Sequence, residues 1–284
     1  MTSAPTVLLV GRADRPDAAV LARRAEQWLL ENGCGVVAAA DDRSTLGLSA
    51  TRAWSPEDRV SLVLSIGGDG TVLRAVKAVG ESETPILGVN VGLLGYLTAV
   101  EPPAMLDALA DFFAGRLASE SRFVLDVAVH TAGGVAHHRA LNEASLEKLT
   151  AGHTVRLQMR IDGAPFTSYQ ADGMIVATPT GSTAYSLSAR GPILSPLMKA
   201  IVVTPLSPHM LFDRSLVLAS SEVVEMEVTG GRPVGLAIDG EYLGVLQPGD
   251  RIECSQATRP AVFVKVHGER FHDVLKSKFG LADR

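Results

Sequence analysis

A glycine-rich turn between an apolar run and a helical pattern constrains this chain more than any other stretch. The turn reads Ser65-Ile66-Gly67-Gly68-Asp69-Gly70-Thr71. The apolar run over 60–66 predicts a buried strand. Apolar residues at helical spacing over 72–79, followed by Gly80, predict a helix that ends at that glycine. Such a turn presents backbone N–H groups and a helix N-terminus to an anion, and glycine tolerates positive φ and close approach of a ligand.

The turn carries one carboxylate, that of Asp69, among three glycines. A carboxylate beside a bound phosphate repels it unless the carboxylate binds a cation or accepts a proton from an attacking hydroxyl. The alternative is an ordinary tight turn in which Asp69 caps the helix. The turn alone leaves both interpretations open.

The first hundred residues alternate between strand and helix patterns, which is typical of a parallel sheet with helices on its faces. Ligands of such sheets bind at the carboxyl ends of the strands, where a second glycine-punctuated loop over 90–97 follows a strand. The dinucleotide fingerprint G-x-G-x-x-G is absent after the first strand, so a dinucleotide is not expected to bind in the Rossmann manner. The expected strands cover 7–10, 35–40, 60–66 and 85–89, and the expected helices cover 17–32, 72–79 and 102–114.

From residue 119 onward the pattern changes to short strands without long helices, which predicts an antiparallel sandwich. Hairpin signals separate several of these strands, among them Asp162-Gly163. We therefore expect two domains, 1–118 and 119–267, with a C-terminal segment over 268–284 that can return to the first. The expected strands of the second domain cover 123–130, 135–141, 155–161, 174–177, 215–218, 223–229, 234–238, 251–254 and 261–266.

Two stretches of the second domain carry candidate binding groups. Six hydroxyls lie between Thr178 and Ser186, and hydroxyls suit ribose, amide and phosphate oxygens because they donate and accept. Tyr185 adds a ring that can stack on a base. Asn142-Glu143 offers an amide to an adenine edge and a carboxylate to ribose hydroxyls. The competing interpretations are a polar surface loop for the first stretch and a turn for the second.

Composition narrows the class of protein. With 46% apolar and 20% charged residues among 284, the chain has the composition of a soluble globular protein, and no apolar run approaches the roughly 18 residues of a membrane span. A net charge of −5 argues against nonspecific nucleic-acid binding. Cys34 and Cys254 lie too far apart in sequence for a metal motif, and 1–5 lacks a secretory signal pattern. We expect a cytoplasmic protein.

Taken together, these motifs resemble the NAD kinase family over about residues 60–270. The glycine-aspartate turn is shared with diacylglycerol kinases, sphingosine kinases and phosphofructokinases, whereas the string Thr178-Pro179-Thr180-Gly181-Ser182-Thr183-Ala184-Tyr185 is far more specific to NAD kinases. The other matching stretches are Asn90 to Thr98, Leu141-Asn142-Glu143, Asp172-Gly173-Met174, Thr204 to His209 and Ile238-Asp239-Gly240-Glu241.

The resemblance implies phosphate transfer from ATP, or polyphosphate in some members, to the 2′-hydroxyl of the adenosine ribose of NAD. It implies an α/β plus all-β fold, with a Rossmann-like N-terminal parallel-sheet domain and a C-terminal antiparallel β-sandwich. It also implies a divalent metal cation such as Mg²⁺ and a homodimer or homotetramer.

The resemblance further implies roles for individual residues. Asp69 would be the catalytic proton acceptor, although a metal-positioning role stays open. Phosphate would be bound by Gly67, Gly68, Gly70 and Thr71. NAD would be contacted by Asp69, Gly70, Arg74, Asn142, Glu143, His153, Asp172, Thr183, Ala184, Tyr185, Ser186, Leu187 and Ser188.

Two rival functions share parts of this pattern. A lipid kinase of the diacylglycerol kinase type has the same glycine-aspartate turn, but it would need a membrane-facing apolar or polybasic patch, which the sequence lacks. A non-catalytic NAD(H)-binding sensor would keep the hydroxyl-rich loop and lose the acid, and here Asp69 is present.

Overall fold

The computed structural model describes residues 4–12, 14–93, 95–266 and 270–281. The chain divides into two compact units: the first comprises Met1–Ser121 and Ala261–Arg284, the second Arg122–Pro260. Leu94 of the second glycine loop and the expected domain boundary at 267/268 lie outside the described residues. No helix within the described ranges is long and apolar enough to span a bilayer.

The first unit is built on a seven-stranded sheet whose order reverses between β1 and β4. Parallel pairing joins β1 to β2 and β4, β2 to β3, β4 to β5, and β5 to β19. In an open α/β sheet a reversal of this kind creates a crevice at the carboxyl ends of the strands, and the glycine turn follows β4 at this point. In spatial order the strands are β3 (Arg52–Ala53), β2 (Gly35–Ala38), β1 (Thr6–Gly11), β4 (Leu62–Gly67), β5 (Ile86–Asn90), β19 (Ala261–Lys265) and β6 (Ala118–Arg122).

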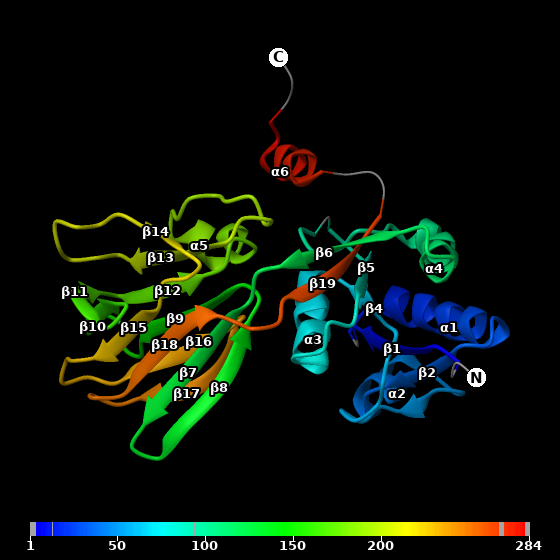
Figure 1. The fold of residues 1–284 in the computed structure, drawn as a ribbon, viewed down its shortest axis with the longest axis horizontal. Coiled ribbons are helices and arrows are strands. Elements are labelled where there is room, and N and C mark those ends of the chain that lie inside the picture. The colour runs from blue at the N-terminus through cyan, green and yellow to red at the C-terminus, as the bar shows by residue number, and fades with distance from the viewer. Residues whose placement is uncertain (1–3, 13, 94, 267–269, 282–284) are drawn as a thin grey trace. The chain divides into compact units, whose positions relative to one another are not determined.

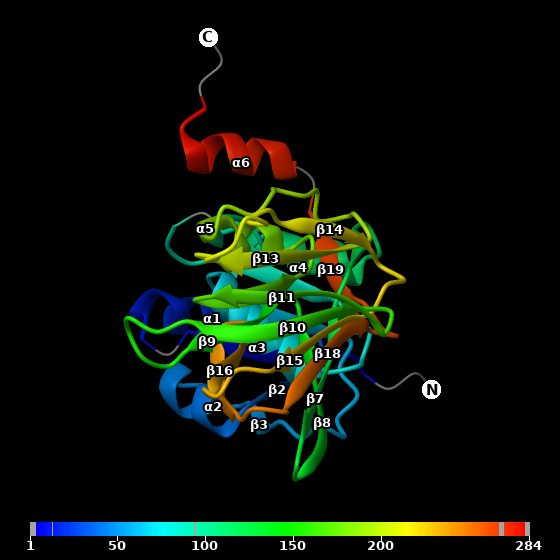
Figure 2. The same ribbon diagram turned by 90° about the vertical axis from the view of Figure 1, so that its left-hand side faces the viewer.

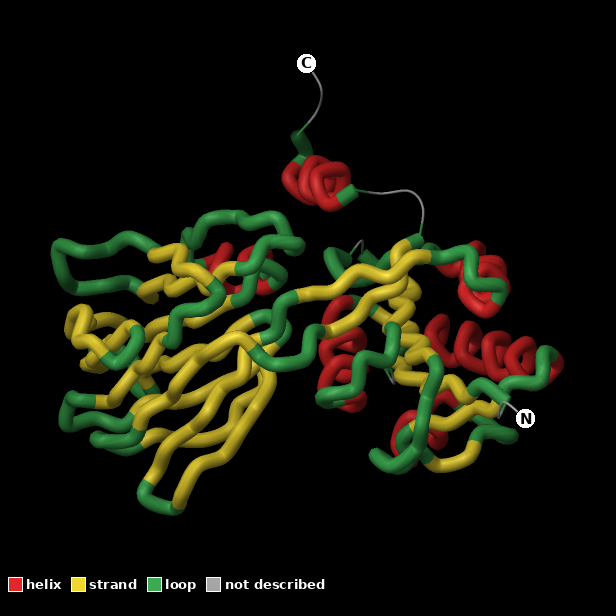
Figure 3. Tube along the Cα trace, viewed as in Figure 1, coloured by secondary structure: helices red, strands yellow, loops and turns green. Residues whose placement is uncertain are grey.

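Helices cover both faces of this sheet, as the alternation of strands and helices predicts. Figure 1 and Figure 3 show α3 on one side of the strands and α1 with α4 on the other. Leu9 and Leu64 share a buried cluster with Leu29 of α1, whereas Gly88 faces Val72 of α3. The helices are α1 (Pro16–Glu31), α2 (Ala40–Leu46), α3 (Asp69–Val79), the short 3₁₀ helix η1 (Pro102–Ala104), α4 (Met105–Phe113) and α6 (Phe271–Phe279).

The second unit is a sandwich of two antiparallel six-stranded sheets, which confirms the predicted fold class. We call them the β10 sheet and the β9 sheet; Figure 2 shows the strands of the β10 sheet facing the viewer. Leu157 and Met226 of the β10 sheet pack against Leu146 and Val176 of the β9 sheet in one buried core.

The strand bounds follow the spatial order of each sheet. The β10 sheet comprises β11 (Ala164–Ala171), β10 (Val155–Ile161), β15 (Val224–Val228), β18 (Arg251–Gln256), β7 (Leu125–Thr131) and β8 (Gly134–Ala140). The β9 sheet comprises β14 (Leu216–Ala219), β13 (Ala200–Leu206), β12 (Gly173–Ala177), β9 (Glu143–Lys148), β16 (Val234–Ile238) and β17 (Glu241–Leu246). Between β12 and β13 lie the 3₁₀ helix η2 (Gly181–Thr183) and α5 (Tyr185–Ser188).

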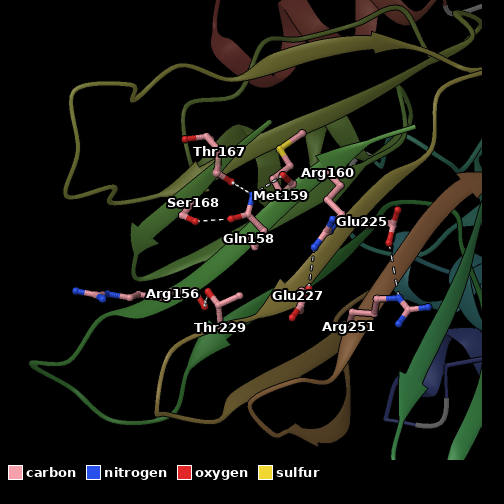
Figure 4. A network of polar contacts seen from close by, with 10 residues as sticks. All are labelled: Arg156, Gln158, Met159, Arg160, Thr167, Ser168, Glu225, Glu227, Thr229 and Arg251. Carbon is pink, nitrogen blue, oxygen red and sulfur yellow. Dashed lines mark hydrogen bonds and ion pairs between the residues drawn. The ribbon is translucent and has the colours of Figure 1, made fainter. Parts of the chain in front are cut away.

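The outer face of the β10 sheet carries charges that pair with one another. Arg160 approaches Glu227 at 3.6 Å, and Arg251 approaches Glu225 at 3.7 Å (Figure 4). Arg251 also lies 3.3 Å from Nδ1 of His130. Neighbouring strands therefore compensate each other's charge across this face.

Several elements differ from the sequence expectation. The strand over 261–265, expected in the second domain, belongs to the sheet of the first unit because it pairs with β5. Asn142-Glu143, for which a turn was the competing interpretation, leads directly into β9. Strands β3, β6, β9, β11, β13 and β17 and helix α2 were not expected. Short or largely polar segments such as β3, β6 and β9 give weak periodic signals. Strand β13, in contrast, is mainly apolar and buried over almost its whole length.

Candidate active site

Asp69 is the first residue of α3, and its carboxylate is held by the second glycine loop. The backbone N–H groups of Tyr96 and Leu97 donate to its two oxygens, each at 2.9 Å. The helix cap is Gly68, with no side-chain capping bond, so the capping interpretation of Asp69 is wrong. Gly95 is required for this arrangement because a Cβ there would overlap the Asp69 carboxylate. The two glycine loops thus form one structure around a single half-buried acid.

The three glycines of the first loop differ in their surroundings, and none of them needs a positive φ. Gly67, Gly68 and Gly70 all have φ outside the positive region. A Cβ at position 67 would overlap Oγ1 of Thr71, whereas positions 68 and 70 face open space. Glycine at 67 is therefore required by packing. Glycine at 68 and 70 leaves the start of α3 uncovered, as close approach of a phosphate would require.

Arg74, one turn into α3, bonds to its own unit. Its guanidinium donates to the Asp42 carboxylate at 2.7 Å and to the Gly11 carbonyl at 2.8 Å. Asp42 is buried, while about half of the Arg74 side chain, 49%, remains exposed. The residue ties α3 to α2 and to the end of β1 while keeping part of its cation at the surface.

Glu143 is a buried acid on the outer face of the β9 sheet. Its Oε2 atom is buried and has no hydrogen-bond partner in the described structure. Burial raises the pKa of Glu143 to about 7, with the charges of Asp239 and Glu147 adding to the rise and the backbone N–H of Tyr185 opposing it. An unpartnered buried acceptor costs stability, so this oxygen is suited to a hydroxyl or amide of a ligand.

Asp239 fixes the backbone that leads to Glu143. Its carboxylate accepts the N–H groups of Leu141, Asn142 and Glu143 at 2.9, 2.7 and 3.1 Å. Burial raises the pKa of Asp239, and these three donors lower it in part. Asp239 has φ of 50° in the turn between β16 and β17, a conformation that Asp tolerates better than most residues. It anchors the Asn142-Glu143 pair from a distant part of the chain.

The hydroxyl-rich loop is mostly buried, so the surface-loop interpretation is wrong. Several of its hydroxyls build the loop itself. Thr178 donates to the Leu141 carbonyl, Ser182 to the Pro179 carbonyl at 2.6 Å, and Thr183 to the Thr180 carbonyl at 3.1 Å. Ser186 lies 2.9 Å from the Thr204 hydroxyl and is fully buried. The Ser186 hydroxyl is therefore internal. Thr180 Oγ1 is buried and has no hydrogen-bond partner among the described residues.

Tyr185 begins α5 and donates its phenol to Glu147 Oε2 at 2.9 Å. Thr183, Ala184 and Leu187 are half-buried around it, and Ser188 is exposed. Asp172 forms an ion pair of 2.7 Å with Lys148, and both side chains are about 30% exposed. His153 is exposed in the loop between β9 and β10.

The structure gathers the expected site residues in two groups, one in each unit. The first unit holds the glycine turn, Asp69 and Arg74, and the second holds the residues from Asn142 to Ser188. Sequence reasoning assigned no role to Asp239, Ser145 or Glu147. A signal existed for the last two, because Glu143, Ser145 and Glu147 alternate with apolar residues and so share one face of β9.

Two family models match this chain. The ATP-NAD kinase N-terminal domain matches residues 7–117, and the ATP-NAD kinase C-terminal domain matches residues 141–266. The chain belongs to the ATP-NAD kinase family. It is 37% identical to an NAD kinase of Desulforamulus reducens, covering 96% of both chains, and 36% identical to NAD kinase 2 of Streptomyces avermitilis, covering 99% of this chain and 96% of the relative.

Solved structures of NAD kinases share this fold. A yeast NADH kinase complexed with NADH matches with a TM-score of 0.90 at 24% identity, covering 99% of this chain and 89% of that one. An NAD kinase from Archaeoglobus fulgidus in complex with ATP matches with a TM-score of 0.73 at 23% identity, covering 97% of each chain. These likenesses support the two-part fold, and the family assignment rests on the closer sequence relatives.

Proposed function

We propose that this chain is an NAD kinase that transfers the γ-phosphate of ATP to the 2′-hydroxyl of the adenosine ribose of NAD, forming NADP and ADP. The observation that carries the proposal is the match to both ATP-NAD kinase domains, over 7–117 and 141–266. If the chain were a lipid kinase that shares only the glycine-aspartate turn, the match to the ATP-NAD kinase C-terminal domain over 141–266 would have no explanation.

Asp69 supplies the base in this proposal. A new bond forms between the ribose 2′-oxygen and the γ-phosphorus, the bond from that phosphorus to the β,γ-bridging oxygen breaks, and the hydroxyl proton passes to Asp69. The role is supported by the two N–H donors that fix the carboxylate while leaving lone pairs on both oxygens. General-base assistance of this kind contributes about 10²- to 10⁴-fold. Gly67, Gly68, Gly70 and Thr71 cradle phosphate at the start of α3.

The NAD contacts come from both units in this proposal. Glu143 and Asn142 hold the adenosine part, supported by the unpartnered Glu143 oxygen and by the three N–H bonds that fix this segment on Asp239. Tyr185 presents its ring to the dinucleotide, and Asp172 accepts from it. Arg74, His153, Gly70 and the backbone over 183–188 complete the contacts.

A divalent cation, Mg²⁺, accompanies the phosphoryl donor in this proposal. Among the described residues no group of three or more His, Cys, Asp or Glu side chains could hold a metal. Mg²⁺ fits such a chain because it is held largely by substrate phosphates and water, with only one or two carboxylates. Asp69 is the acid at the glycine turn that would contribute, and the cation would offset phosphate charge. ATP is the proposed donor, and polyphosphate is the alternative donor that the family resemblance implies for some members.

We further propose a cytoplasmic homodimer or homotetramer. The oligomeric state rests on the family resemblance, and multi-angle light scattering of the purified chain measures it directly. A strictly monomeric protein with full activity would contradict this part of the proposal alone.

The activity is tested by supplying ATP, Mg²⁺ and NAD and detecting NADP with an NADP-specific dehydrogenase. We expect NADP to accumulate in proportion to enzyme and time. A parallel reaction with polyphosphate in place of ATP defines the donor range. Binding of NAD without any NADP from either donor would instead support a sensor, and phosphorylation of a lipid in vesicles would support a lipid kinase.

A further inference from the structure

Tyr185 is held at both ends of its side chain. Its ring packs against an apolar patch on the outer face of the β9 sheet that includes Ile175, Ala177 and Val202. Its phenol donates to Glu147 at 2.9 Å. Burial, followed by the hydrogen bond to Glu147, raises the pKa of Tyr185 to about 12. The phenol therefore stays protonated near neutral pH and remains the donor.

Glu147 is itself fixed before any ligand arrives. Ser145, two residues earlier on the same face of β9, donates its hydroxyl to Oε1 of Glu147 at 2.9 Å. One carboxylate oxygen thus accepts from Ser145 and the other from Tyr185. Ser145 is buried and Glu147 is half-buried, so the donor end of this bond lies inside the protein.

Glycines on both neighbouring strands place no side chain of their own beside Glu147, and Leu206, Leu149 and Tyr242 approach the glycine positions instead. Gly173 of β12 and Gly235 of β16 stand opposite Glu147 in the strand register. A Cβ at position 173 would overlap the Leu146 carbonyl, so a larger residue is excluded there. Neither neighbouring residue contributes a side chain that would stand between Glu147 and the phenol from α5.

We propose that Glu147 is a positioning residue that fixes the ring of Tyr185 for NAD binding. The inference rests on the proposed contact between Tyr185 and NAD, and Glu147 acts through Tyr185 without touching the dinucleotide. An unanchored ring must be immobilised when NAD binds, and that ordering weakens binding. An anchored ring is already ordered, so loss of the anchor raises the Kd for NAD and leaves the transfer step nearly unchanged.

The experiment compares Tyr185→Phe, Glu147→Ala, Glu147→Gln and the double variant Tyr185→Phe/Glu147→Ala by calorimetry with NAD and by steady-state kinetics. We expect Tyr185→Phe and Glu147→Ala each to raise the Kd for NAD by roughly 3- to 10-fold, with kcat within about twofold of wild type. The double variant should bind no worse than either single variant, because both remove the same bond. Glu147→Gln keeps an acceptor oxygen for the phenol and should restore most of the affinity.

Two controls keep the inference separate from the proposed function and from general loss of stability. Glu227→Ala removes a comparable half-buried acid from the outer face of the β10 sheet and should leave the Kd unchanged. Tyr185→Ala removes the ring itself, and an unchanged Kd there would overturn both the proposed contact and the inference. If Tyr185→Ala weakens binding but Tyr185→Phe and Glu147→Ala do not, or if their effects add in full, only the positioning role is overturned.

Discussion

The two sheets of the second unit treat their outer carboxylates differently. On the β10 sheet, Glu225 and Glu227 each face an arginine of a neighbouring strand. On the β9 sheet, Glu143 is buried, and among the described residues no cation pairs with it. One sheet therefore cancels its own charge, while the other keeps an acceptor unsatisfied.

This difference separates acids whose charge is already compensated from acids that keep an oxygen available to a ligand. A paired, half-exposed carboxylate contributes little to stability and gains nothing from a ligand. An unpaired, buried carboxylate costs stability until a donor reaches it. Asp69 extends the comparison to the first unit, because its carboxylate accepts two backbone N–H groups and, among the described contacts, no cation. Such acids are the ones in which we expect substitutions to change catalysis or binding.

The largest effect is expected for Asp69→Asn. If Asp69 accepts the 2′-hydroxyl proton, kcat falls by roughly 10²-fold or more, while the Kd for NAD measured by calorimetry changes little. Asn has a single side-chain oxygen, so one of the N–H bonds from Tyr96 and Leu97 is also lost, at about 1–2 kcal/mol of stability. Urea unfolding separates that cost from the loss of turnover.

A magnesium titration distinguishes the two roles left open for Asp69. A base cannot be replaced by added cation, whereas a weakened metal site recovers part of its activity when Mg²⁺ is raised. Normal turnover of Asp69→Asn at ordinary Mg²⁺ would remove Asp69 from the mechanism altogether.

The next effect concerns the pH dependence of stability and the pKa of Glu143. Its folded-state pKa of about 7 lies above the ordinary value of 4.5, so the folded protein binds more protons than the unfolded chain between these values. Stability is therefore highest below the unfolded pKa and falls as the pH rises through about 7. Glu143→Gln removes this loss, and we expect it to be about 1–3 kcal/mol more stable than wild type at pH 8, with weaker NAD binding.

Urea unfolding of the ligand-free protein at pH 5, 6, 7 and 8 measures this change. Glu227→Gln is the matched control, since it makes the same substitution on the charge-paired sheet and should leave the pH slope as in wild type. Parallel pH slopes for Glu143→Gln and wild type would contradict the assignment of a high pKa to Glu143.

A smaller effect is expected for Asp172→Ala, which tests an acid that has a cation partner yet is proposed to bind NAD. If the Asp172 carboxylate bonds the dinucleotide equally in the ground and transition states, its loss raises KM by roughly tenfold and changes kcat little. Lys148→Ala breaks the same 2.7 Å ion pair and serves as the control. If both variants raise KM equally, Asp172 acts through Lys148. That result would strengthen the distinction between paired and unpaired acids.

The fold was largely predictable because its strongest signals are local. The glycine turn, the helix ending at Gly80 and the alternation of strands and helices all follow from short-range pattern, and the structure confirms them. Strand β9 was missed because only Ala144 and Leu146 point inward between polar residues, so its period of two gave few apolar positions. The sequence of β19 predicts one more strand of the sandwich. Only its long-range pairing with β5 shows that it belongs to the sheet of the first unit.

The site was predictable in its residue types and not in their partners. The sequence identified the acid of the glycine turn. The position of the Asp69 carboxylate, however, depends on backbone N–H groups that lie 27 and 28 residues further along the chain. The hydroxyls over 178–186 were correctly seen as unusual, yet their use inside the loop depends on tertiary contacts such as that of Thr178 with Leu141. The need for Gly67 comes from Thr71 packing against it, which no φ-based rule reveals.

The smallest effect is expected on the charged face itself. Arg160 and Glu227 lie 3.6 Å apart with 37% and 32% of their side chains exposed, so solvent screens their attraction. In a double-mutant cycle of Arg160→Ala and Glu227→Ala, we expect a coupling energy below about 1 kcal/mol that fades in high salt, with KM for NAD and kcat unchanged. A large, salt-resistant coupling would show that this face is structurally important. A change in the KM for NAD would contradict the distinction between the two sheets, because it would place substrate binding on the sheet whose charges are already paired.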